Sequence, residues 1–161
     1  MLWPAKKGGL FMARYFEDYK IGDRFTTPGR TVSEGALAII EGLGGYCAPF
    51  MIDEEFAKAT PLGGRIAPGR AVAFLMGGLV EMSDIFDLET VIALMGLNNI
   101  RFRSPLRAGD TIRVEMEITD MRETKNPERG LLIHKEICKN QRGEVVAEVE
   151  GTHLIKRKTR G

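Results

Sequence analysis

The sequence predicts an α+β fold in which an antiparallel sheet packs around one buried helix. Residues 63–84 read GGRIAPGRAVAFLMGGLVEMSD and carry no charge between Arg70 and Glu81, so a helix there has to be buried on every side, by the same chain or by a second copy. Past residue 91 the hydrophobic pattern changes from helical spacing to alternation, which predicts strands. A chain of 161 residues suits one domain of this kind.

The chain ahead of this helix is expected to begin with an extended entry over residues 15–23 and an irregular strand over 24–32. Thr31 and Glu34 have the spacing of a capping box, and the apolar residues that follow predict a helix that ends at the glycines 44–45. This helix would present one apolar face to the core.

A short helix and then the central helix are expected next. Asp53 is predicted to cap the segment EEFAKAT, which ends at Pro61. The central helix would run from Pro68 to Ser83 over about 24 Å. Pro68 suits a first helical turn, because its missing N–H has no helical partner there. The glycines 77–78 interrupt the apolar run and it is too short for a bilayer, so no membrane span is expected.

Alternating residues predict the strands of the second half of the chain, over residues 91–95, 97–103, 111–119, 131–138 and 145–155. In the segment TIRVEMEIT one face is apolar and the other is charged, so one face packs and the other is wet. His153 is expected on an apolar face as a structural residue. His134 is expected to face water or the second side of the sheet.

Composition narrows the function classes. The net charge of +1, with 43% hydrophobic and 28% charged residues, is typical of a soluble globular protein and argues against a nucleic-acid partner. Cys47 and Cys138 stand alone, which indicates neither a metal site nor a disulfide framework and makes the reducing cytoplasm the expected compartment. A single domain over residues 15–155 is expected, between an extension at 1–14 and a basic tail at 156–161.

Three sequence blocks carry a family resemblance. They are YFEDYKIGDRFTTPGRTVSE at 15–34, IDEEFAKATPLGGRIAPG at 52–69, and IRFRSPLRAGDTI at 100–112 followed by NQRGEVV. Together they resemble the MaoC-like dehydratases, the (R)-specific enoyl-CoA hydratase branch of the hot-dog fold. The resemblance implies a sheet wrapped around the central helix, an acyl-CoA thioester as ligand with no other cofactor, and a homodimer, a higher oligomer or a heteromer.

The family's catalytic loop has the pattern G-D-x-N-P-x-H, and residues 45–51 here read GYCAPFM. Tyr46 therefore stands at the position of the Asp and Met51 at that of the His. A phenol with a pKa of about 10 is a poor base and a thioether does not titrate, so neither residue is assigned a catalytic role. The alternative is that both side chains simply pack in the hydrophobic core.

The resemblance also implies substrate-binding residues around the start of the central helix. The backbone N–H of Gly69 would donate to the thioester oxygen, and Pro68, Arg65 and Arg70 flank that position. Either arginine is equally consistent with an ordinary surface residue.

Three functions remain open. The first is a hydratase relative that binds a CoA thioester without the usual pair. The second is a non-catalytic binding or partner subunit. The third is an acyl-CoA thioesterase in which a carboxylate such as Glu41 directs water at the thioester.

Overall fold

The computed structural model describes residues 13–83 and 85–158. The helical elements are η1 (Phe16–Asp18), α1 (Glu34–Gly44), α2 (Pro49–Ile52), α3 (Glu54–Lys58) and α4 (Gly69–Glu81). The strands are β1 (Arg24–Thr26), β2 (Arg30–Thr31), β3 (Val91–Phe102), β4 (Thr111–Glu123), β5 (Arg129–Lys139) and β6 (Val145–Lys156).

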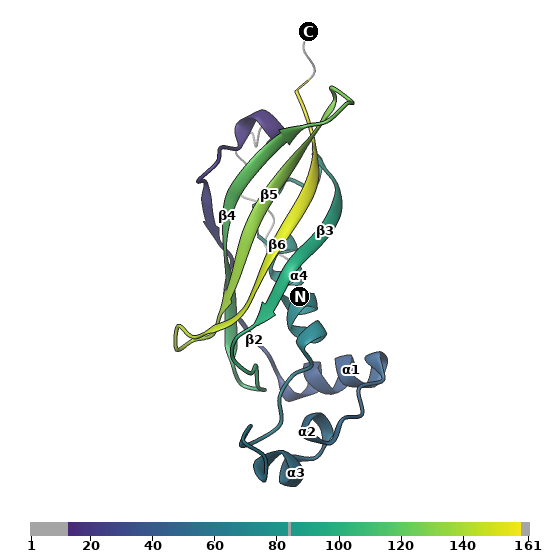
Figure 1. Ribbon diagram of the computed structural model, residues 1–161, viewed down its shortest axis with the longest axis vertical. Coiled ribbons are helices and arrows are strands. Elements are labelled where there is room, and N and C mark those ends of the chain that lie inside the picture. Colours follow the sequence, from purple (N-terminus) through teal and green to yellow (C-terminus); the bar gives the residue numbers. More distant parts are fainter. Residues whose placement is uncertain (1–12, 84, 159–161) are drawn as a thin grey trace, which may run out of the picture.

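The strands form one antiparallel sheet in the order β1-β4-β5-β6-β3, with β2 paired to β4. Figure 1 shows the four long strands side by side, α4 behind them, and α1, α2 and α3 gathered beyond one end of the sheet. Strand β3 lies at the edge of the sheet and combines the two strands expected over 91–95 and 97–103. The predicted α+β architecture is confirmed.

The core lies between α4 and the inner face of the sheet. Strand β4 alternates as predicted, and its apolar residues Ile112, Val114, Met116 and Ile118 are all buried. They belong to the same hydrophobic cluster as Leu75 of α4. Alternation in the strands therefore fixes which side of the sheet covers the helix.

The single chain covers the central helix on one side only, so the cover by a second copy that the sequence left open stays a prediction. One side of α4 packs into the core through Ala71, Val72, Leu75, Met76, Leu79 and Val80. The opposite stripe is open, and the Phe74 side chain is 70% exposed. The reason is that the sheet covers only one side of the helix. The helix also starts one residue after the predicted position, with Pro68 as its N-cap.

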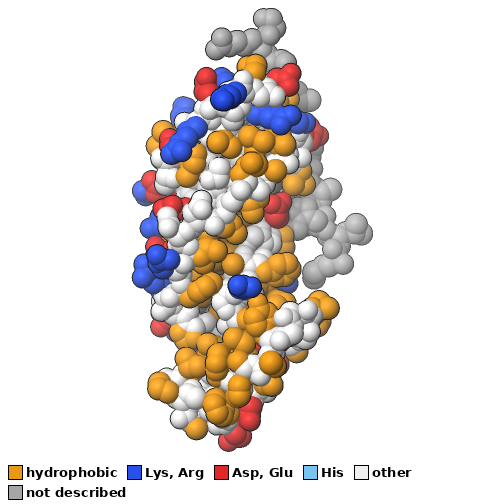
Figure 2. Space-filling model, turned by 45° about the vertical axis from the view of Figure 1, so that its right-hand side comes forward, with side chains coloured by type: hydrophobic (Ala, Val, Ile, Leu, Met, Phe, Trp, Pro, Cys, Tyr) orange, Lys and Arg blue, Asp and Glu red, His pale blue; other side chains and the backbone are white. Residues whose placement is uncertain are grey.

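The open stripe of α4 lies on the side of the molecule where β3 also exposes apolar side chains. Those of β3 are Ile92, Leu94, Met95, Leu97 and Phe102. Figure 2 turns this side toward the viewer, and hydrophobic side chains cover much of it. Both the helix and the edge strand thus leave apolar surface without cover in one chain.

The helix caps confirm one prediction and correct another. The Asp53 side chain accepts a hydrogen bond from the Phe56 N–H at 3.0 Å, as predicted for a cap of α3. The cap of α1 is Ser33, whose hydroxyl accepts from the Ala36 N–H at 3.1 Å. Thr31 lies in β2 instead, so the capping box expected there is wrong.

The placement of the two histidines on the sheet also differs from expectation. His153 lies on the apolar inner face, as predicted. His134 lies on that face too, completely buried at 0% exposure, so the expectation that it faces water or the second side is wrong. Its neighbours Leu131 and Ile133 are half-buried on the outer face, which explains the error.

The basic residues after β6 return to the start of the domain rather than extending into solvent. The Arg157 guanidinium pairs with Glu17 at 2.7 Å and with Glu123 at 2.9 Å, and Lys158 pairs with Asp18. The expected extension at 1–14 and the end of the expected tail lie mostly outside the described residues. Within the described part of the chain, no helix has the length and apolar character needed to cross a membrane.

Candidate functional site

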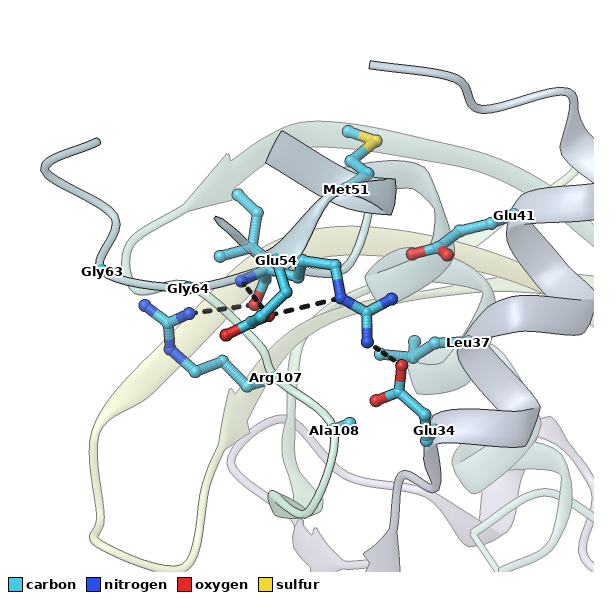
Figure 3. Close-up of a pocket in the computed structure, with 11 residues that line it drawn as sticks. Glu34, Leu37, Glu41, Met51, Glu54, Gly63, Gly64, Arg107 and Ala108 are labelled. Carbon is cyan, nitrogen blue, oxygen red and sulfur yellow. Dashed lines mark hydrogen bonds and ion pairs between the residues drawn. The ribbon is translucent and has the colours of Figure 1, made fainter. Parts of the chain in front are cut away.

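A cleft of about 310 Å³ lies at the end of the sheet, among the short helices and the loop that leads into α4. It is lined by Glu34, Leu37, Glu41, Met51, Glu54, Gly63, Gly64, Arg65, Ile66, Arg107 and Ala108. Figure 3 shows the lining side chains of α1 on one side and Met51 and Glu54, from α2 and α3, across from them. Four stretches of the chain thus meet around one hollow: α1, the segment of α2 and α3, the loop before α4, and the loop between β3 and β4.

Helix α1 supplies three of the lining side chains because Glu34, Leu37 and Glu41 recur at helical spacing and share one face. Glu41 is only 7% exposed. Within the described residues its carboxyl has no ion-pair or hydrogen-bond partner. Burial raises the pKa of Glu41, while the positive charge of Arg65 opposes the rise. This carboxyl is therefore available for chemistry.

Arg65 joins the two sides of the cleft. Its Nε donates to Glu54 Oε2 of α3 at 3.3 Å, and its Nη2 pairs with Glu34 of α1. These contacts hold the pKa of Glu54 below its usual value, through hydrogen bonds from the Arg65 backbone and side chain. Arg65 therefore fixes the width of the cleft, and its charge is already matched by two carboxylates.

The floor of the cleft is a glycine turn held by Arg107. Gly63 has φ +69° and Gly64 has φ +150°, conformations that favour glycine. The Arg107 guanidinium donates to the Arg65 carbonyl at 2.9 Å and also to the Leu62 carbonyl. A Cβ at Gly64 would lie 3.1 Å from Arg107 Nη1, so the turn and the guanidinium fit closely.

Sequence reasoning missed Arg107. Its only signal is that it lies inside the third block of the family resemblance. Its partners are backbone carbonyls 42 and 45 residues earlier in the chain, which no local pattern connects.

The structure brings together some of the residues singled out in the sequence and separates others. Met51, Arg65 and Glu41 all line the cleft. Tyr46 does not; its ring packs over Gly44, where an added Cβ would lie 2.5 Å from the ring. The Tyr46 N–H donates to the Glu41 carbonyl at 2.9 Å, so Tyr46 helps to end α1.

The residues at the start of α4 lie outside the cleft lining. Pro68 is buried, Arg70 is exposed, and Gly69 packs under the ring of Phe102. A Cβ at Gly69 would lie 2.9 Å from that ring, so glycine is required for the close approach. The first N–H groups of α4 have no partner within the helix, as in any helix start.

The lining determines what the cleft can do chemically. It contains one buried carboxyl, two exposed carboxylates paired to an arginine, and neither histidine nor cysteine. Among the described residues, proton transfer in this cleft therefore rests on Glu41.

Comparison with known proteins identifies the fold of this domain. A single antiparallel sheet packed on one central helix is the arrangement of a hot-dog domain. A Mycobacterium tuberculosis protein described as a double hot-dog fold superposes with a TM-score of 0.77 at 22% identity, over 92% of this chain and 46% of that one. This likeness concerns the fold alone.

Residues 18–137 match the MaoC-like domain model, and the chain belongs to this family. It is 28% identical to an (R)-specific enoyl-CoA hydratase of Rhodospirillum rubrum over 141 residues, covering 88% of this chain and 91% of the relative. The structure of a MaoC-like dehydratase from the same organism superposes with a TM-score of 0.78 at 28% identity, over 91% and 99% of the two chains. Two longer relatives are spanned only to 33% and 38%.

Proposed function

We propose that the protein binds an acyl-CoA-type thioester in the cleft between α1 and α3. Met51, at the position where the family has its catalytic His, lines a hollow of about 310 Å³, and this observation carries the proposal. The volume lies in the range of about 300–1,000 Å³ that is usual for small-molecule sites. The hydratase and dehydratase names of the relatives support a thioester as ligand.

In this proposal the protein lacks the acid–base pair with which the family hydrates an enoyl-CoA. Adding water across a double bond needs one group that takes a proton from water and one that gives a proton to carbon. The Asp and His of the family pattern are replaced by Tyr46 and Met51, a phenol turned onto Gly44 and a thioether that does not titrate. The ligand is therefore bound, and enoyl-CoA is not hydrated by this pair.

Thioester hydrolysis is a second candidate function, favoured by Glu41. In this reaction the Glu41 carboxylate takes a proton from a water molecule as the water oxygen bonds to the thioester carbonyl carbon. The carbon–sulfur bond then breaks, and the leaving thiolate takes up the proton from the Glu41 carboxyl, which returns to the carboxylate. A carboxyl whose pKa is raised by burial is a better base near neutral pH than an exposed one.

A non-catalytic role in a larger assembly uses the open apolar side of α4 and β3. Phe74 and Leu94 are both exposed in the single chain, and a second hot-dog unit would cover them. The double hot-dog protein of Mycobacterium tuberculosis, of which this chain matches 46%, is an example of two such folds in one chain. The partner is either a second copy or a related chain that supplies the missing residues.

Calorimetric titration of the purified protein with butyryl-CoA tests the binding proposal. We expect saturable binding, which weakens when Met51→Trp fills the cleft. The control Met82→Trp, outside the cleft, leaves binding unchanged. Absence of binding with a Kd below about 1 mM would overturn the proposal.

Release of free CoA from the same ligand separates the two candidate functions. If Glu41 is the base, Glu41→Gln lowers release by about 100-fold or more, while Glu55→Gln, an exposed carboxyl on α3 outside the cleft, leaves it unchanged. Binding without release supports the non-catalytic role.

A further inference from the structure

The charges that line the cleft between α1 and α3 do not balance. The ionisable side chains of the lining are three carboxyls and two guanidiniums, those of Glu34, Glu41, Glu54, Arg65 and Arg107. With every group ionised, the lining therefore carries one negative charge in excess. Lys58 does not remove this excess, because it lies outside the lining and is shared between Glu54 and Glu55.

The excess charge belongs to Glu41. Arg65 pairs with Glu34 on one side and with Glu54 on the other. The Arg107 guanidinium donates to two backbone carbonyls and holds the glycine turn. By contrast, within the described residues no group forms an ion pair with the Glu41 carboxyl or donates a hydrogen bond to it. Both cations of the lining are thus engaged elsewhere, and Glu41 lacks a counter-charge.

Helix α1 places this carboxyl where it faces the cleft but is poorly reached by water. Glu41 is 7% exposed, and Figure 3 shows its carboxyl pointing from α1 into the hollow. Burial raises its pKa; the charge of Arg65 opposes this rise and that of Glu34 adds to it. Buried carboxylates in proteins are normally paired with a cation, so this one favours a ligand that brings a positive charge.

The rest of the lining determines what such a ligand looks like beside its charge. Leu37, Met51, Ile66 and Ala108 contribute apolar surface to the same hollow. Carbon atoms of a ligand can pack against these side chains without leaving a polar group unpaired. A short aliphatic segment that ends in a cation therefore matches the lining better than a cation alone.

Four kinds of ligand end can be compared at Glu41. A carboxylate would be repelled, and a methyl group would leave the carboxylate without a partner. A hydroxyl would donate one hydrogen bond but leave the charge unmatched. An ammonium group donates up to three hydrogen bonds and supplies the missing charge, and charge-assisted bonds of this kind are the stronger ones.

We propose that Glu41 is the counter-ion of the ligand, and that the cleft selects thioesters whose acyl end carries an ammonium group over those with an uncharged or anionic end. This inference rests on the proposed binding of a thioester in the same cleft. In this role Glu41 contacts the end of the acyl group and does not direct water at the thioester carbonyl.

The test compares three CoA thioesters by calorimetric titration of the full chain at pH 7, where an aliphatic amine is protonated. The acyl groups of 3-aminopropionyl-CoA and butyryl-CoA have the same length and differ only in ending with an ammonium or a methyl group. Succinyl-CoA presents a carboxylate instead. We expect 3-aminopropionyl-CoA to bind about tenfold more tightly than butyryl-CoA or better, and succinyl-CoA to bind more weakly than both.

One variant and a matched control assign the preference to Glu41. Glu41→Gln keeps the shape of the side chain and removes its charge, so we expect it to abolish the preference while butyryl-CoA still binds. Glu55→Gln removes an exposed carboxyl of α3 outside the lining and leaves the preference unchanged. A purely structural role of Glu41 would instead weaken both ligands alike in Glu41→Gln, and that result would overturn the assignment.

The outcomes separate this inference from the proposed function. Equal affinities of 3-aminopropionyl-CoA and butyryl-CoA would overturn the inference and leave thioester binding standing. No binding of any of the three thioesters would overturn both. Succinyl-CoA that binds as tightly as 3-aminopropionyl-CoA would show that the arginines of the cleft attract the ligand. A preference that survives in Glu41→Gln would place the counter-ion elsewhere, and either result contradicts the role of Glu41.

Discussion

The cleft at the end of the sheet and the polar chain beneath the sheet, formed by His134, Glu136 and His153, give ionisable side chains opposite surroundings. In the cleft, Arg65 lies between Glu34 and Glu54, and all three side chains reach solvent. Beneath the sheet, His134 and Glu136 are buried; His134 Nε2 lies 2.8 Å from His153 Nδ1, while His134 Nδ1 has no hydrogen-bond partner among the described residues. The pKa values follow this difference, because water and counter-charges stabilise ions and burial does not. Stability should therefore respond strongly to changes in the second region and weakly to changes in the first.

The largest effect is expected for Gly151→Ala in β6. An added Cβ would lie 2.2 Å from His134 Cε1, and the buried ring has no space to move away. We expect the free energy of unfolding to fall by about 3 kcal/mol, measured by urea denaturation. Gly96→Ala in β3 is the matched control, since its Cβ meets nothing within 4 Å. Equal effects of the two variants would contradict the close packing around His134.

A smaller effect is expected from the ionisation of Glu136. The unfolded chain releases this proton near pH 4.5, whereas the folded protein keeps it up to about pH 7. Stability from this group therefore falls as the pH rises through that window. Relative to wild type, Glu136→Gln should gain roughly 2.5 kcal/mol on going from pH 5 to pH 8, because one pKa unit corresponds to about 1.4 kcal/mol. Denaturation curves at both pH values measure it, and a pH-independent difference would contradict the buried carboxyl.

The two histidines shift stability in the other direction. Burial lowers their pKa values from 6.5 to about 3 and 4. As the pH falls below 6.5, the histidines of the unfolded chain therefore bind protons, whereas those of the folded protein stay neutral. Stability from these groups is present above pH 6.5 and is lost on acidification. The polar chain as a whole is thus best tolerated near pH 6 to 7, as judged from these pKa values.

The smallest effect is expected in the cleft. Arg65→Gln removes two exposed ion pairs, and such pairs contribute about 0–1 kcal/mol each. We expect a loss of stability below about 1 kcal/mol, together with weaker binding of butyryl-CoA because the two sides of the cleft are no longer joined. A loss as large as that of Gly151→Ala would show that the cleft, like the core, carries the stability of the domain.

The hydrophobic periodicity of the sequence was sufficient to predict the strands of the sheet and helix α4. The strict alternation of apolar and polar residues in β4 predicts a strand, and the uncharged apolar run of α4 predicts a core helix. It failed for His134, because β5 is apolar on both faces and alternation alone does not tell which face meets the helix. It also did not tell whether one chain alone covers α4, and Phe74 is left exposed in the single chain.

The candidate site was predictable only in part. The family resemblance led to Met51 and Arg65, and the position of Glu41 on the first helix made it a possible base. Arg107 was missed because it acts on backbone carbonyls distant in the sequence. The polar chain was missed because its three members are brought together by the register of β5 and β6, which pairs Leu132 with His153.

The most direct test of the central claim is the rate of crotonyl-CoA hydration by the purified protein, measured where butyryl-CoA binding is established. We predict binding with no hydration above the uncatalysed rate, because Tyr46 and Met51 do not supply the acid and base that the reaction needs. Robust turnover would contradict this account.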